Sequence, residues 1–274
     1  CDVMIKRFHE YKRQLLKVMH VVTAFLRIKH GTTGTVVPRS VIFAGKAAPS
    51  YHAAKRIMRL ANAVADVVNA DPDVNHVLRV AFLPDYNVSR AEVVIPAADL
   101  SEQISMAGKE ASGTSNMKLA LNGALTIGTL DGANIEIRDR VGADDFFRFG
   151  LDAEQAAATR RNGYSPHAYY DSDSELRAVV DAIASGMFAD GDRGAFQPIV
   201  DDLLHHDEYL TMADYRAYID CQDAVDKAWQ DRDAWLRASI RNTAGSGHFS
   251  ADRSVADYCR TIWHATPVPV PGSA

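Results

Sequence analysis

The residues with the clearest chemical potential lie in one stretch, 110–136. A run of small and hydroxylated residues, 111–116, precedes Lys118, which has apolar neighbours. A glycine flanked by serine and threonine before a helix can present backbone N–H groups and hydroxyls to an anion. A lysine in the apolar first turns of that helix would be partly desolvated, which lowers its pKa and frees the amine for a Schiff base. An N-capped helix with an ordinary surface lysine explains the same residues equally well.

A second group of basic side chains follows the first strand-like segment: Lys6, Arg7, His9, Lys12 and Arg13. On one helix Arg7 and Lys12 would diverge by about 140°. They converge better if Arg7 lies in the loop after a strand and Lys12 lies in the first helical turn. That geometry suits a phosphate at a helix N-terminus, beyond the carboxyl end of a strand. A solvated basic face is the alternative.

Alternating strand and helix patterns must position these groups. Strand-like runs are predicted at 2–8, 41–44, 78–83, 93–96, 124–129 and 144–150. Helices are predicted from about residue 9 and over 50–68, and then over 152–161, 172–185, 195–204, 213–242 and from 250 onward. Repeated strand–helix units indicate a doubly wound, parallel α/β sheet. We expect a Rossmann-like lobe at 1–150, incomplete at its N-terminus, a helical part at 151–266 packing on the same lobe, and a loose tail at 267–274.

Composition excludes several classes of protein. The 274 residues are 47% hydrophobic, and the net charge of −5 argues against general nucleic-acid binding. No apolar run approaches the roughly 20 residues that span a bilayer. Cys1, Cys221 and Cys259 are far apart, so we expect free thiols in the cytoplasm and no metal site. The start, CDVMIKRF, has neither an initiator methionine nor an apolar leader, so we expect a fragment of a longer protein.

The stretch from Glu110 through Lys118 to Asn122, continued by DGAN at 131–134, closely resembles the pyridoxal-phosphate attachment signature of the α-glucan phosphorylases. KRFHEYKRQLL at 6–16 resembles a second block of the same family, and weaker similarity covers essentially the whole chain. One departure is Ser115, which stands where many relatives have a second glycine. The resemblance implies the two-lobed GT-B glycosyltransferase fold, of which this chain would be the C-terminal lobe.

The resemblance also implies roles for individual residues. Lys118 would form the Schiff base with pyridoxal 5′-phosphate, while Arg7 and Lys12 would hold the substrate phosphate. Further contacts to the cofactor are implied for Lys6, Tyr86, Gly113, Thr114 and Ser115. Contacts to the bound sugar or phosphate are implied for His9, Glu110, Ala111, Ser112 and Gly113. From the residues alone, Tyr86 is equally consistent with a half-buried turn aromatic, and Glu110 with an acid near a helix N-terminus.

The implied reaction is phosphorolysis, in which orthophosphate and an α-1,4-glucan give α-glucose 1-phosphate with retention. Two phosphate groups must then lie close together, and cations must offset their repulsion. The cofactor phosphate is taken to relay a proton. No pair of carboxylates of the kind that retaining glycosidases use can be nominated, and this mechanism does not need one. A homodimer is implied for the full-length protein.

Two other interpretations remain open. An aminotransferase would require an aspartate for the pyridinium nitrogen and an arginine for a substrate carboxylate, and nothing marks such a pair. Alternatively, the chain is a lobe that binds the cofactor and phosphate but has no turnover alone, because an N-terminal lobe is missing.

Overall fold

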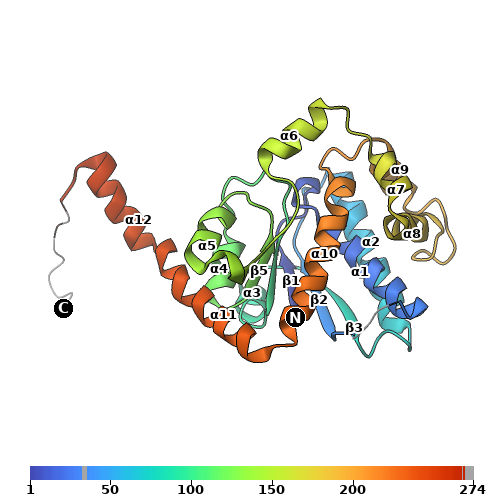
Figure 1. Cartoon of the computed structure of the whole chain (residues 1–274), viewed down its shortest axis with the longest axis horizontal. Helices are drawn as coiled ribbons and strands as arrows, with labels where there is room; N and C mark the ends of the chain where they lie inside the picture. The colour runs from blue at the N-terminus through green and yellow to red at the C-terminus, as the bar shows by residue number, and fades with distance from the viewer. Residues whose placement is uncertain (33–35, 267, 269–274) are drawn as a thin grey trace.

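The computed structural model describes residues 1–32, 36–266 and 268. Its centre is a sheet in which neighbouring strands are parallel (Figure 1). The strands are β1 (Asp2–Ile5), β2 (Arg39–Ala44), β3 (Leu78–Leu83), β4 (Leu100–Gln103), β5 (Leu125–Gly128) and β6 (Phe146–Arg148). They lie in the order β3-β2-β1-β4-β5-β6. This confirms the predicted doubly wound α/β fold.

The strand order reverses between β1 and β4, which are direct neighbours with Asp2 opposite Leu100. From β1 the chain continues to β2 on one side, and from β4 it continues to β5 on the other. Ligands of open α/β sheets bind beyond the carboxyl ends of the strands at such a switch point. The loops that begin at Lys6 and Ile104 therefore border the place where a ligand is expected.

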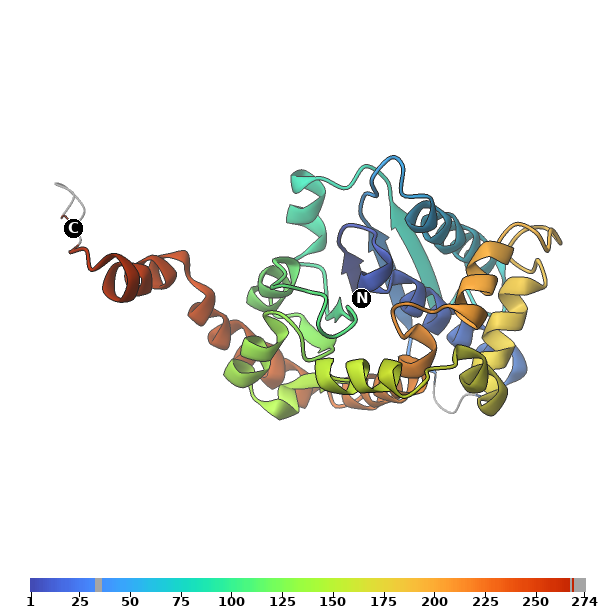
Figure 2. The ribbon, with the colours of Figure 1, turned by 90° about the horizontal axis from the view of Figure 1, so that it is seen from above.

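Helices cover both faces of the sheet (Figures 1 and 2). The first face carries α1 (Gln14–His30), α2 (His52–Ala70) and α10 (Thr211–Trp229), with α7 (Pro166–Ser172), α8 (Ser174–Ala184) and α9 (Gln197–His205) packed against them. The second face carries α3 (Val88–Val94), α4 (Ser115–Leu121), α5 (Asn134–Val141) and α11 (Arg232–Gly245). On α2, residues Ile57, Leu60, Val64 and Val68 recur at helical spacing and are buried. This apolar stripe fixes α2 against the sheet.

The fourth strand was missed by the sequence analysis, which placed a strand at 93–96 instead. That segment is the end of α3 and the turn after it, and Asn87 caps α3 by accepting the Arg90 N–H at 3.1 Å. The strand itself has the sequence LSEQ, and all four of its residues are buried. Because its polar side chains find partners on both faces of the sheet, a search for apolar runs could not find it.

Two predicted helices have different bounds in the structure. The chain does not enter a helix at His9: it makes a short 3₁₀ turn (Glu10–Lys12), passes through Arg13 with φ of 58°, and only then begins α1. The predicted helix 213–242 is divided into α10 and α11. Asp231 ends the continuity by capping α11, since its side chain accepts the Ala234 N–H at 2.9 Å.

The last described segments leave the body of the molecule. After α6 (Ala153–Arg161) and the helices already named, α12 (Ala251–Tyr258) and the turn Cys259–Trp263 project away from the sheet (Figure 2). No residue of α12 is buried. Across the described residues, none of the helices combines the length and apolar character that crossing a bilayer requires. The tail predicted at 267–274 lies outside the described residues, except for Val268.

Candidate functional site

A partly buried hydrogen bond connects the ends of the two strands at the switch point. Lys6 follows β1, and its Nζ donates to Oε1 of Gln103, the last residue of β4, at 2.7 Å. Gln103 is only 4% exposed. Its amide nitrogen donates to Ser101 Oγ at 2.9 Å and toward Ser115 Oγ, in the first residue of α4, at 3.4 Å. The Gln103 amide is therefore held on both sides and fixes the position of the Lys6 ammonium.

A second basic side chain, that of Lys12, forms an ion pair in the same region. Lys12, in the turn before α1, donates to Glu110 Oε2 at 2.7 Å, and Ser105 Oγ donates to the same oxygen at 2.8 Å. The Glu110 backbone N–H in turn donates to Asp131 at 2.7 Å. These contacts bring two residues that the sequence analysis nominated for the substrate phosphate and sugar, Lys12 and Glu110, into direct contact.

The site carries more positive than negative charge. Burial and, to a smaller extent, the charge of Lys12 lower the pKa of Lys6 to about 8, although the charges of Glu110 and Glu102 oppose both effects. Burial alone would raise the pKa of Glu110, but the hydrogen bond from Lys12 and the charge of Lys6 bring it below its ordinary value. The carboxylate of Glu110 thus pairs with Lys12, and the hydrogen-bond partner of Lys6 is a neutral amide. An anion such as a phosphate would supply the missing negative charge.

The loop before α4 is held in shape by amide side chains. Gly113 has φ of 90°, and a Cβ atom there would lie 2.9 Å from Asn116 Nδ2. Asn116 donates to the Ser112 carbonyl at 3.2 Å and to Asn134 Oδ1 at 3.1 Å. Asn134 donates to the Gln103 carbonyl at 3.0 Å. The predicted glycine-bearing loop is therefore tied to the strand whose last side chain holds Lys6.

Lys118 differs from the prediction. It lies on the exposed side of α4, because the helix turns Asn116, Leu119 and Ala120 inward. The expectation that apolar neighbours in the sequence would desolvate its amine is wrong for this chain. An exposed lysine remains accessible to an aldehyde.

The other predicted site residues differ in their exposure and in their contacts. The Arg7 side chain is exposed, and its guanidinium makes no hydrogen bond or ion pair within the described part of the chain. The His9 ring lies 4.5 Å from that of Tyr11 and 4.8 Å from that of Tyr51, measured between centroids, and burial lowers the pKa of His9. Tyr86 is half-buried against the apolar cluster of the second face. Ala111, Ser112 and Thr114 are exposed.

Three important residues were not identified from the sequence, or were assigned differently. Gln103 gave no signal, because only the strand order places it at the switch point. Asp131 accepts the backbone N–H groups of Lys109 and Glu110, and its place in the DGAN segment could have suggested a role. Arg13 was grouped with the basic cluster, but it is fully buried and pairs with Asp214 of α10 at 2.6 Å.

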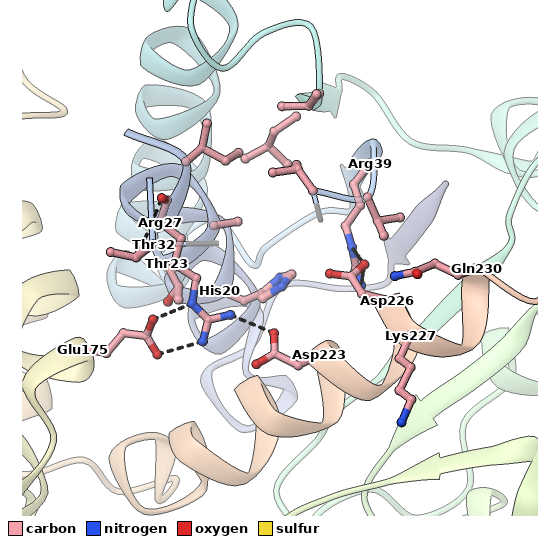
Figure 3. A pocket seen from close by; sticks show the side chains of 16 residues that line it. His20, Thr23, Arg27, Thr32, Arg39, Glu175, Asp223, Asp226, Lys227 and Gln230 are labelled. Atoms are coloured by element: carbon pink, nitrogen blue, oxygen red, sulfur yellow. Dashed lines mark hydrogen bonds and ion pairs between the residues drawn. The ribbon is translucent and has the colours of Figure 1, made fainter. Parts of the chain in front are cut away.

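A cavity of about 550 Å³ lies at the opposite, amino-terminal edge of the sheet, between α1, α10 and the starts of β2 and β3 (Figure 3). Its arginines are already paired: Arg27 with Glu175 and Asp223, and Arg39 with Asp226. The cavity thus offers space, but its arginines have no surplus charge. We place the candidate site at the carboxyl edge because the unneutralised cations and the glycine-bearing loop converge there.

A doubly wound parallel sheet with surplus cations at its switch point defines an α/β protein suited to binding a phosphate-bearing ligand. Comparison with known sequences is more specific. The chain belongs to the carbohydrate phosphorylase family, whose model matches residues 1–265. The sheet and its helices are consistent with one lobe of the GT-B fold.

Several relatives are similar over nearly the whole chain. It is 54% identical over 269 residues to a glycogen phosphorylase from Synechocystis sp., covering 98% of this chain and 32% of that protein. It is 52% identical over 266 residues to the brain form of glycogen phosphorylase from Homo sapiens, which covers 97% of this chain. It is 51% identical over 277 residues to the muscle form from the same organism, which covers 100% of this chain. The chain spans about a third of the length of these relatives.

Proposed function

We propose that this chain holds pyridoxal 5′-phosphate and belongs to a protein that cleaves an α-1,4-glucan with orthophosphate, releasing α-D-glucose 1-phosphate with retention. The observation that carries the proposal is the pair of lysines at the switch point, which together face one carboxylate and one neutral amide. Family membership and the names of the relatives support the same assignment.

The residues present fit a phosphate-bearing aldehyde. Lys118 supplies an accessible amine, and the positive φ of Gly113 shapes a loop that begins beside it. Thr114 and Ser115 carry that loop into α4, and Tyr86 is proposed to line the cofactor ring. When bound, the cofactor supplies a phosphate group that can pass a proton to the substrate phosphate.

The chain's own side chains then have distinct proposed tasks. Lys6 neutralises the cofactor phosphate, while Lys12 and the exposed Arg7 bind the substrate phosphate, Arg7 through its two-pronged guanidinium. Further contacts to the sugar or phosphate are proposed for His9, Glu110, Ala111, Ser112 and Gly113. Because both phosphates would lie beside cations in a partly buried site, their mutual repulsion is reduced where charge develops in the transition state.

We further propose a division of labour along the chain. Residues 1–150 bind the cofactor, and residues 151–266 support this lobe, as the buried Arg13–Asp214 pair illustrates. Because the chain spans about a third of its relatives' length, we propose that it has no turnover alone. By analogy with the family, we propose that the whole protein is a homodimer. Release of glucose 1-phosphate by the purified chain would contradict the first statement, and a monomeric mass for the full-length protein would contradict the second.

Borohydride trapping tests the cofactor assignment. The chain is incubated with pyridoxal phosphate, reduced and digested, and the labelled lysine is identified by mass spectrometry. We expect label confined to the peptide that contains Lys118, and its loss in Lys118→Arg. Label spread evenly over Lys46, Lys55 and other surface lysines would show general amine reactivity and overturn the assignment.

A further inference from the structure

Two consecutive residues of β4 each hold a lysine, on opposite faces of the sheet. Glu102 accepts from Lys17 Nζ at 2.6 Å on the face that α1 and α10 cover. Gln103 accepts from Lys6 Nζ at 2.7 Å on the face that α4 covers. Consecutive residues of a strand point to opposite faces, so this arrangement follows from the strand itself. The two acceptors have nearly the same shape and differ in charge.

We propose that Gln103 is a positioning residue that fixes the Lys6 ammonium without neutralising it, which leaves that charge available to the phosphate of a bound ligand. The inference rests on the proposed function, because it names what controls the phosphate-binding end of the same site.

Packing does not explain why this position carries an amide. The Lys6 ammonium can only donate, so the Gln103 oxygen faces it and the amide nitrogen faces the hydroxyls of Ser101 and Ser115. A hydroxyl can rotate to donate as readily as to accept. A glutamate of the same length would therefore find partners for both its oxygens here. What it would change is the charge next to Lys6.

Glu102, the neighbouring residue, shows how a carboxylate in place of the amide affects the lysine that it holds. Glu102 is fully buried and accepts from Lys17, from Tyr218 at 2.7 Å and from Gln222 at 2.9 Å. Lys17 also pairs with Asp2 at 2.8 Å. With two carboxylates, Lys17 has no charge to offer a ligand. Lys6, held by an amide, retains its charge.

The test compares Gln103→Glu, which adds a carboxylate, with Gln103→Met, which removes the acceptor but stays neutral. Gln230→Glu is the matched control: it makes the same chemical change at an exposed position at the end of α10. Two quantities are measured in the complete 274-residue chain. The first is affinity for pyridoxine 5′-phosphate, with pyridoxine as the probe without phosphate. The second is the titration midpoint of Lys6, from the pH dependence of its labelling by acetic anhydride.

We expect Gln103→Glu to weaken binding of pyridoxine 5′-phosphate at least tenfold, to leave binding of pyridoxine unchanged, and to raise the Lys6 midpoint. Gln103→Met is expected to lower that midpoint, whereas Gln230→Glu should leave it unchanged. Opposite shifts at one position are not expected from a general loss of structure. An unchanged midpoint in Gln103→Glu, or a raised midpoint with unaltered affinity, would overturn the inference. Absence of phosphate-dependent binding by the unsubstituted chain would instead refute the proposed function, while the midpoints still decide how Gln103 acts on Lys6.

Discussion

Two regions of the sheet differ in how their cations are compensated: the buried face under α1 and α10 (the α1/α10 face), and the site beyond the carboxyl ends of β1 and β4 (the switch-point site). On the α1/α10 face, Lys17 and Arg39 share three carboxylates, those of Asp2, Glu102 and Asp226. In the switch-point site, Lys12 pairs with the carboxylate of Glu110, and Lys6 donates to the neutral amide of Gln103. The basic residues of the first region come from α1 and β2, and those of the second come from the loop after β1 and the turn before α1. Counting basic residues in the sequence therefore does not distinguish them.

The difference indicates which charges are structural and which are available to a ligand. Buried charges are tolerated when ion pairs and hydrogen bonds compensate them. The α1/α10 face satisfies this condition without any ligand, and its network ties α10 to three strands. The switch-point site does not fully satisfy it, because the hydrogen-bond partner of Lys6 is a neutral amide. We therefore expect substitutions on the α1/α10 face to change the free energy of unfolding, and substitutions in the switch-point site to change ligand affinity.

The largest predicted effect is a loss of stability on the α1/α10 face. Glu102→Gln keeps the shape of the side chain but removes one of the two carboxylates that pair with the buried Lys17. Breaking a buried pair in this way costs about 3–5 kcal/mol of unfolding free energy, measured by urea denaturation. Gln103→Glu, one residue away, is expected to cost about 1 kcal/mol or less, because its new carboxylate meets Lys6. Equal losses of unfolding free energy in the two variants would contradict the proposed difference between the α1/α10 face and the switch-point site.

Lys6→Met tests the switch-point site. We expect the affinity for pyridoxine 5′-phosphate to fall at least tenfold, equivalent to about 1.4 kcal/mol, because the phosphate loses its partly buried cation. The free energy of unfolding is expected to change by about 1 kcal/mol or less, since the lost charge was poorly compensated. Calorimetric titration and urea denaturation of the same preparation measure the two quantities. A large loss of stability with unchanged affinity would show that Lys6 is structural.

The pH dependence provides a further test, because the free energy of unfolding and the affinity for pyridoxine 5′-phosphate should change in opposite directions as pH rises. The pKa of Lys6 falls from an ordinary 10.5 to about 8 on folding. Between these values the unfolded chain binds more protons, so Lys6 makes stability rise with pH in this window. Affinity for pyridoxine 5′-phosphate should fall as pH rises through about 8, by up to about tenfold per unit. Lys6→Met should abolish that fall, and an unchanged fall in this variant would assign it to another group.

Much of the fold was predictable because most strands are apolar and most helices carry a buried stripe. Strand β3 was predicted with its observed bounds, 78–83, from its apolar run alone. Strand β4 was not, because its residues Glu102 and Gln103 are polar and find partners far away in the sequence, among them Lys17 and Lys6. The break at Arg13 was invisible for the same reason: its guanidinium is held by Asp214, 201 residues later.

The candidate site was predictable where a local motif carries it. Lys12 and Glu110, which form an ion pair in the structure, lie in the two blocks that the sequence analysis had singled out, although their pairing was not predicted. The exposure of Lys118 could not be inferred from apolar neighbours along the chain, because α4 turns those neighbours toward the sheet. Gln103 required the strand order, since nothing local marks the last residue of a polar strand as the partner of Lys6.

The smallest predicted effect on ligand affinity concerns the loop before α4. Gly113→Ala places a Cβ at φ of 90°, within 2.9 Å of Asn116 Nδ2, and Asn116 connects through Asn134 to the Gln103 carbonyl. We expect a cost of about 1–2 kcal/mol in unfolding free energy, together with a modest loss of affinity for pyridoxine 5′-phosphate as the loop shifts. Gly163→Ala is the matched control, because Gly163 also has positive φ but no atom lies within 4 Å of its Cβ position. If the two variants lose stability equally and neither loses affinity, backbone strain alone explains Gly113, and the loop does not transmit structure to the ligand site.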